Sequence, residues 1–166
     1  METRLILENI RSAHNVGAIF RTADGAGVSR VYLVGYTPTP IDRFGRRHPE
    51  ITKTSLGATD TVPWEYHEDC EGLIKQLQHD GVAIVALEQT PSAKRYTTPL
   101  PKTLAFVLGN EVEGVSAATL AAADQVVHIP MSGTKESLNV ATAAGIALFA
   151  HRDRDQYSTT ATTSSY

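Results

Sequence analysis

The sequence lacks the features that mark a secreted or membrane protein. It has one cysteine, Cys70, so no disulfide can form within the chain. No apolar run approaches the roughly 20 residues that a bilayer-crossing helix needs. The N-terminal segment METRLILENIRSAHN has charges inside its short apolar run and therefore lacks the layout of a secretory signal. We therefore expect a cytoplasmic protein that is not bound to a membrane.

Several nucleotide, hydrolase and metal motifs are also missing. No G-x-G-x-x-G follows a predicted strand, and no G-x-x-x-x-G-K-[ST] or G-x-S-x-G occurs. The six histidines show no metal-ligand spacing, and each is predicted to be a surface or packing residue. These absences argue against a dinucleotide- or phosphate-loop protein and against a serine hydrolase, and we predict no metal.

The sequence also lacks the excess of positive charge that would indicate nucleic-acid binding. The net charge is −3, but it is uneven, because residues 1–60 carry eight Lys or Arg and six Asp or Glu. A local patch can bind phosphates even when the total charge is negative. On charge alone, a solvated loop is the stronger interpretation of the densest basic stretch. That stretch contains Arg43, Arg46, Arg47, His48 and Lys53.

What is present is a pattern that alternates between strand and helix periods. Strands are predicted at residues 4–7, 30–34, 60–66 (at an edge), 82–87, 104–108 and 126–129, and helices at 15–26, 49–55, 71–79, 117–123 and 138–150. This alternation predicts an α/β fold with a mainly parallel sheet flanked by helices. Residues 1–154 are expected to form one domain, and residues 155–166 a disordered polar tail.

Three segments carry the candidate chemistry. In the first, Asn15 stands where a helix is expected to begin and could cap it, and Arg21 follows inside a mostly apolar helix. In the second, LGNEVEG, a buried strand leads into a glycine turn that could present backbone amides to a ligand. In the third, Ser137 could cap the final helix, whose start suits ligand or phosphate oxygens. Taken singly, each segment is also compatible with an ordinary cap or turn.

Together, the three segments resemble the signature motifs of the SpoU/TrmH family, within the SPOUT class of RNA methyltransferases. N-x-G-x-x-x-R runs from Asn15 to Arg21, LGNE-x-x-G ends at Gly114, and IPM-x-G-x-x-x-SLN runs from Ile129 to Asn139. The stretch KTSLGATDTVPW is also typical of this family. The similarity spans residues 4–150.

The resemblance implies a fold, a cofactor and a reaction that the residue pattern did not show. The C-terminal part of the sheet would be threaded into a deep trefoil knot. The cofactor would be S-adenosyl-L-methionine, the enzyme a homodimer with its active site at or near the interface, and the reaction methylation of a ribose 2′-hydroxyl in tRNA or rRNA. Many relatives carry a further N-terminal RNA-binding domain.

Site residues follow from the same resemblance. The catalytic positions would be Asn15, Arg21, Glu111, Ser137 and Asn139. The cofactor-binding positions would be Leu87, Glu88, Gly109, Asn110, Gly114, Ile129, Met131, Ser137, Leu138 and Asn139. Asn15 and Arg21 of the first motif would also bind RNA, as would Arg11, and the basic stretch, rather than the resemblance, adds the candidate RNA-backbone residues Arg43, Arg46, Arg47 and Lys53. The alternatives are a SPOUT-type base methyltransferase, a non-catalytic RNA-binding homodimer of the same fold, and an unrelated nucleotide-binding α/β protein.

Overall fold

A parallel β-sheet forms the centre of the molecule. The computed structural model describes the backbone of residues 1–160 and the side chains of residues 1–154. In this part of the chain the sheet has seven strands in the order β3-β2-β1-β6-β4-β7-β5, and every pairing is parallel. The strands are β1 (Glu2–Glu8), β2 (Arg30–Val34), β3 (Trp64–His67), β4 (Ala83–Leu87), β5 (Lys94–Arg95), β6 (Thr103–Leu108) and β7 (Gln125–His128). The predicted fold class is confirmed.

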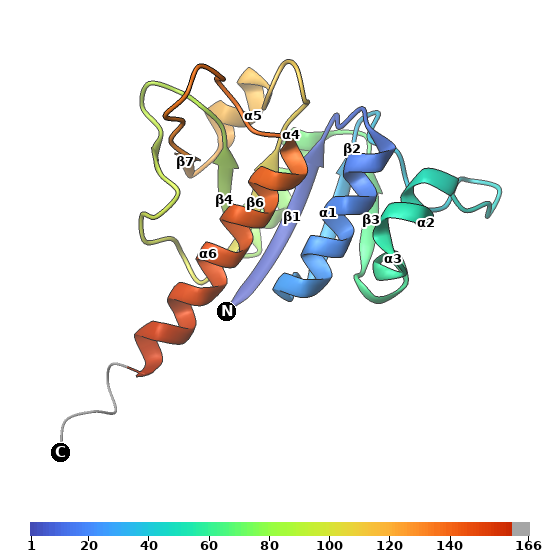
Figure 1. The fold of residues 1–166 in the computed structure, drawn as a ribbon, viewed down its shortest axis with the longest axis horizontal. Helices are drawn as coiled ribbons and strands as arrows, with labels where there is room; N and C mark the ends of the chain where they lie inside the picture. The colour runs from blue at the N-terminus through green and yellow to red at the C-terminus, as the bar shows by residue number, and fades with distance from the viewer. Residues whose placement is uncertain (161–166) are drawn as a thin grey trace.

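Helices cover both faces of this sheet. They are α1 (Ala13–Ala26), α2 (Pro49–Ser55), α3 (Ala58–Thr61), α4 (Cys70–His79), α5 (Ala117–Ala122) and α6 (Val140–Thr160). Leu5 and Leu7 of β1 belong to the core cluster that contains α1 and α6, whereas Ile6 belongs to the cluster that contains α4. Figure 1 shows α1 and α6 side by side across one face of the sheet. Burial on both faces explains why the central strands are continuously apolar.

The strand order reverses between β1 and β6. From β1 the chain moves outward to β2 and β3, and it later returns to place β6 on the other side of β1. The loops that follow these two adjacent strands therefore leave in different directions. In open α/β sheets, ligand sites form at the carboxyl ends of the strands at such a reversal.

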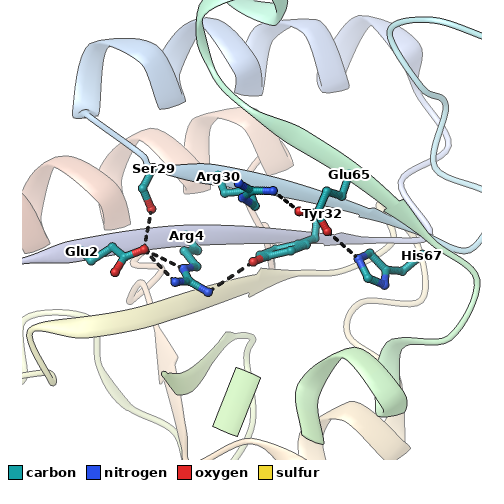
Figure 2. A network of polar contacts seen from close by, with 7 residues as sticks. All are labelled: Glu2, Arg4, Ser29, Arg30, Tyr32, Glu65 and His67. Atoms are coloured by element: carbon teal, nitrogen blue, oxygen red, sulfur yellow. Dashed lines mark hydrogen bonds and ion pairs between the residues drawn. The ribbon is translucent and has the colours of Figure 1, made fainter. Parts of the chain in front are cut away.

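One part of the sheet carries polar rather than apolar side chains. Figure 2 shows these contacts across β1, β2 and β3, where Arg4 donates to the Tyr32 hydroxyl at 3.3 Å and Arg30 pairs with Glu65. His67 lies 3.1 Å from the same Glu65 carboxylate. Partly exposed ion pairs contribute little to stability. Among these contacts, the pair of Arg30 with Glu65 joins edge strand β3 to β2.

One predicted strand needs correction, and one strand was not predicted. The edge strand predicted at residues 60–66 begins only at Trp64, because residues 58–61 form the short helix α3. It does lie at the sheet edge, as predicted. The short strand β5 was not predicted, since its two residues, Lys94 and Arg95, are charged and exposed.

The final helix also differs from its prediction. It begins at Val140 rather than Leu138 and continues to Thr160, ten residues beyond the predicted end. Residues 151–160 contain neither glycine nor proline, so nothing in the sequence stops the helix there. The tail predicted to be disordered from residue 155 is thus helical as far as Thr160, and its last part, residues 161–166, lies outside the described residues.

Candidate active site

A cavity of about 370 Å³ lies beyond the carboxyl ends of β4, β6 and β7. It is lined by Leu87, Glu88, Gln89, Leu108, Gly109, Asn110, Glu111, Val112, Glu113, Gly114, His128, Ile129, Glu136, Ser137, Leu138, Asn139, Val140 and Ala143. Every predicted cofactor position is among them except Met131. The loop of residues 129–139 has no regular secondary structure, so no periodicity could tell which of its residues face the cavity.

The turn after β6 shapes one wall of this cavity. Asn110 and Gly114 exchange backbone hydrogen bonds of 3.0 and 2.9 Å, and the Asn110 side chain accepts from the amides of Val112 and Glu113. A Cβ atom on Gly109 would lie 2.2 Å from the carbonyl carbon of Gly114, so the turn closes only over glycine. The prediction that this turn presents its amides to a ligand is therefore wrong for four of its amides, those of Asn110, Val112, Glu113 and Gly114, which are bonded within the turn.

Glu111 joins this turn to the start of α1. Its carboxylate accepts from the backbone amides of Arg11 at 2.9 Å and Ser12 at 3.0 Å, and from the Asn15 side chain at 3.1 Å. Burial alone raises the pKa of this carboxyl, but the hydrogen bonds from the Arg11 and Ser12 amides and from Asn15 outweigh it and lower the pKa. Glu111 is therefore an ionised acceptor and not a poised proton donor.

Asn139 extends the connection to the third segment. Its side-chain nitrogen donates to the Asn15 side-chain oxygen at 3.1 Å, so Glu111, Asn15 and Asn139 form one hydrogen-bonded chain. Asn139 also accepts from the amides of Ala141 and Thr142. Three segments that are up to 124 positions apart thus meet at the cavity.

Both predicted helix caps are corrected. The Ser12 hydroxyl, not Asn15, caps α1, by accepting from the Asn15 amide at 3.2 Å. Asn139, not Ser137, accepts from the first amides of α6. In each case the helix begins away from its predicted start, which moves the cap. The Asn15 side chain instead hydrogen-bonds to Glu111 and Asn139 of the other two segments. Ser137 is exposed at the cavity wall.

Arg21 does not line the cavity of its own chain. It lies exposed on α1 and lines a second depression, formed by His14, Ala18, Arg21, Thr22, Gly25, Lys53, Thr54, Leu56 and Phe149. We call this depression the basic hollow. Of the predicted site residues, Arg21 and Lys53 thus line the basic hollow, whereas Glu111 and Asn139 line the cavity.

Of the remaining predicted RNA-binding residues, the four arginines are exposed, whereas Asn15 is buried. Arg11 follows β1, and Arg43, Arg46 and Arg47 lie in the loop before α2. Arg46 pairs with Asp42 at 2.8 Å, and Arg47 pairs with Asp60 at 2.9 Å. Exposed pairs of this kind leave the guanidinium groups accessible to phosphate.

Sequence reasoning missed four polar residues that line the cavity, which are Gln89, Glu113, His128 and Glu136. Gln89 donates to the Ile129 carbonyl at 2.6 Å and lies 3.1 Å from the Nδ1 atom of His128. Gln89 lies two residues after the end of the apolar strand β4, a position typical of ligand-site residues, and that was the available signal. His128 had been predicted to be a surface or packing residue, but it lines the cavity.

The described residues do not support a metal site, a cysteine nucleophile or a membrane-spanning helix. Among residues 1–154, no group of three or more His, Cys, Asp or Glu side chains is placed to hold a metal ion. Burial raises the pKa of the Cys70 thiol to about 12, so it stays protonated and is a poor nucleophile. Within the part of the chain that the structure describes, no helix combines the length and the apolarity that spanning a membrane requires.

The sequence profile of the SpoU rRNA Methylase family matches residues 2–149. The chain belongs to this family. The 23S rRNA (guanosine-2′-O-)-methyltransferase RlmB of Neisseria meningitidis serogroup B is 35% identical to this SpoU-family chain over 144 residues, which cover 87% of the chain and 55% of the relative. The chain thus spans about half the length of the curated relatives that it matches.

Solved structures agree with this assignment. An AdoMet-bound rRNA methyltransferase from Sinorhizobium meliloti superposes on the SpoU-family chain with a TM-score of 0.83 at 32% identity, over 92% of this chain and 56% of the other. The TrmH/SpoU tRNA modifying enzyme of A. aeolicus superposes with a TM-score of 0.83 at 25% identity, over 95% and 77%. The family predicted from the three motifs is confirmed.

Proposed function

We propose that this chain is the catalytic domain of an S-adenosyl-L-methionine-dependent methyltransferase that methylates a ribose 2′-hydroxyl in rRNA or tRNA. The observation that carries the proposal is the hydrogen-bonded chain from Glu111 through Asn15 to Asn139, which joins all three family motifs beside one cavity. The named activity of the RlmB relative, guanosine-2′-O-methylation of 23S rRNA, supports this reaction class, and the A. aeolicus relative, named as a tRNA modifying enzyme, supports tRNA as the alternative substrate.

The cavity fits S-adenosyl-L-methionine in size and chemistry. Small-molecule pockets measure roughly 300–1,000 Å³, and this cavity measures about 370 Å³ and is lined by both polar and apolar side chains. Leu87, Ile129 and Leu138 provide apolar wall for an adenine ring, while Gln89 and Ser137 provide polar groups for the ribose and the amino acid part. When bound, the cofactor supplies an activated methyl group on a sulfonium.

The chain's own residues then have to place the ribose hydroxyl and help remove its proton. Glu111 and Asn15 act as positioning residues, because their polar atoms are used to hold the loops together. Alignment of reacting atoms alone can lower a barrier by roughly 7–11 kcal/mol in the best intramolecular cases. Fixed loops at the cavity mouth provide such alignment.

Arg21 is the residue that we assign to the RNA. A guanidinium stays protonated, so Arg21 is unsuited to act as a base. It would grip the phosphate next to the target ribose and stabilise the developing alkoxide, and the proton would leave through that phosphate or through water. Because Arg21 lies in the basic hollow and not in the cavity of its own chain, the proposal requires a homodimer in which Arg21 of one copy faces the cavity of the other.

Nucleoside mass spectrometry tests the proposal. The purified chain is incubated with methyl-labelled S-adenosyl-L-methionine and with rRNA or tRNA, and the RNA is digested. We expect a 2′-O-methylated nucleoside. Label on a base would replace the proposal with the base-methyltransferase alternative, and RNA binding without any transfer would replace it with the non-catalytic dimer. The trefoil knot and the cytoplasmic location stay predictions from the sequence.

A further inference from the structure

The loop of residues 41–47 holds an aromatic ring out in solvent. Phe44 is 66% exposed, and Figure 1 shows its loop projecting beyond α2. The guanidinium carbon of Arg43 lies 4.8 Å from the ring centroid, and that of Arg46 lies 5.2 Å from it. A single exposed phenylalanine is ordinary on a protein surface, but this ring also has two arginine guanidinium groups within cation–π distance.

Hydrogen bonds fix the shape of this loop. The Asp42 carboxylate accepts from the amides of Phe44 at 2.8 Å and Arg46 at 3.0 Å, and also from the Arg46 side chain at 2.8 Å. The Asp42 amide donates to the Arg46 carbonyl at 2.9 Å, and Ile41 bridges to Arg47. Gly45 closes the tip at a φ of +78°. The Phe44 ring therefore lies on a turn whose shape is fixed by hydrogen bonds.

The position of the loop connects it to the basic hollow. The chain runs from Arg47 through His48 directly into α2, and Thr54 of α2 donates to the His14 carbonyl of α1 at 3.2 Å. Lys53 of α2 and Arg21 of α1 both line the hollow. The loop that carries Phe44 is therefore attached to the same pair of helices, α1 and α2, that carries Arg21, the residue that we assign to the target phosphate.

A flat ring between cations matches the chemistry of an unpaired nucleotide. Aromatic side chains stack on bases of single-stranded nucleic acid, while arginine contacts the adjoining phosphates. In an RNA duplex the bases are stacked inside the helix and cannot reach such a ring. We propose that Phe44 stacks on an unpaired RNA base close to the methylated nucleotide, with Arg43 holding the neighbouring phosphate. This inference rests on the proposed function.

Binding to a short single-stranded RNA oligonucleotide, and to the same oligonucleotide annealed to its complement, tests this inference. Phe44→Ala is expected to bind the single strand about tenfold more weakly, the effect of losing one base–aromatic stack, with little change for the duplex. Phe44→Trp is expected to restore binding, because it keeps a stacking face. Arg43→Gln is expected to lower the salt dependence of binding by about one ion, whereas Phe44→Ala leaves that dependence unchanged.

The matched control is Tyr66→Ala, which removes an exposed aromatic from edge strand β3 and is expected to bind as the unchanged protein does. Equal affinity of Phe44→Ala and the unchanged chain for the single strand would overturn the inference. So would conversion of a dimer to a monomer by Phe44→Ala in light scattering, since the ring would then be a contact between copies. Methyl transfer to RNA that persists beside either result would leave the proposed function standing, whereas its absence from the unchanged chain would count against that function alone.

Discussion

The cavity and the basic hollow differ in how they are built. The cavity is walled by loops that are bonded to one another, with Glu111 accepting three N–H groups and Asn15 buried. The basic hollow is open, and its cations Arg21 and Lys53 are exposed on helices α1 and α2. One region is preorganised for a small ligand, and the other presents charge to a large one.

This difference separates two tasks that the proposed reaction requires. A methyl donor needs a shaped pocket, whereas an RNA backbone needs accessible positive charge. A single copy of the chain contains both regions but does not bring Arg21 to its own cavity. The account therefore depends on a second copy to join them, and the following variants affect the two regions separately.

The largest expected effect belongs to Arg21. Arg21→Lys should lower single-turnover methyl transfer by more than about 100-fold, because lysine cannot form the bidentate, planar contact to phosphate. RNA binding, measured by filter retention, should be largely retained, and cofactor binding in calorimetry should be unchanged. Normal turnover of Arg21→Lys would remove the phosphate clamp from the mechanism.

The second effect concerns the cavity turn. Gly109→Ala should weaken S-adenosyl-L-methionine binding by more than about tenfold, because its Cβ would lie 2.2 Å from the Gly114 carbonyl carbon and push the turn apart. Gly133→Ala is the matched control, since its Cβ meets nothing within 4 Å. Calorimetry of both variants checks this, and equal affinities would show that the turn does not shape the cofactor site.

The third effect is on stability. Glu111→Gln should lower the free energy of unfolding by about 1–3 kcal/mol, because one of the N–H groups now bonded to the carboxylate would face an amide NH₂. Glu113→Gln, in the same turn but exposed, is the control. Urea denaturation at neutral pH measures both. Identical stability of the two variants would contradict the positioning role of Glu111.

The stability difference should also depend on pH. The pKa of Glu111 is lowered in the folded protein, so its carboxylate stabilises the fold above the unfolded value of about 4.3. That contribution is lost as the pH falls through the folded pKa. The gap between the unchanged protein and Glu111→Gln should therefore shrink below about pH 4. A gap that stays constant in denaturation curves down to acid pH would argue against a lowered pKa.

The smallest effect is expected in the basic loop. Neutralising Arg46 and Arg47 together to Gln should weaken RNA binding at low salt and reduce its salt slope by about 1.5. Stability should hardly change, because the pairs of Arg46 with Asp42 and Arg47 with Asp60 are exposed. Lys75→Gln, on exposed α4 surface of the opposite helix layer, is the control. An unchanged slope in the double variant would make the loop an ordinary solvated one.

Much of the fold could be predicted because it depends on local pattern. Buried strands such as residues 104–108 are continuous apolar runs, and α2 begins at Pro49, where a helix start favours proline. The caps could not be predicted in the same way. Ser12, Asn15, Ser137 and Asn139 are all good capping residues, so only the final packing decides which of them is used.

The site residues also divide into those that could be predicted from the sequence and those that could not. Gly109 and Gly114 could be assigned to the cavity because their motif, at the end of a predicted strand, resembles that of the SpoU/TrmH family. The side on which Arg21 emerges could not, because it depends on how α1 is rotated against the sheet. Gln89 and His128 were missed because a single polar residue at a strand end carries no motif.

Co-expression of two differently tagged copies tests the central claim most directly. One copy carries Arg21→Ala. The other carries Leu138→Arg, which places a large charged side chain in the cavity that Leu138 lines. Each variant alone should be inactive. If Arg21 of one copy serves the cavity of the other, the purified mixed dimer should regain methyl transfer at its one intact site. A mixed dimer that is as inactive as both parents would contradict the account.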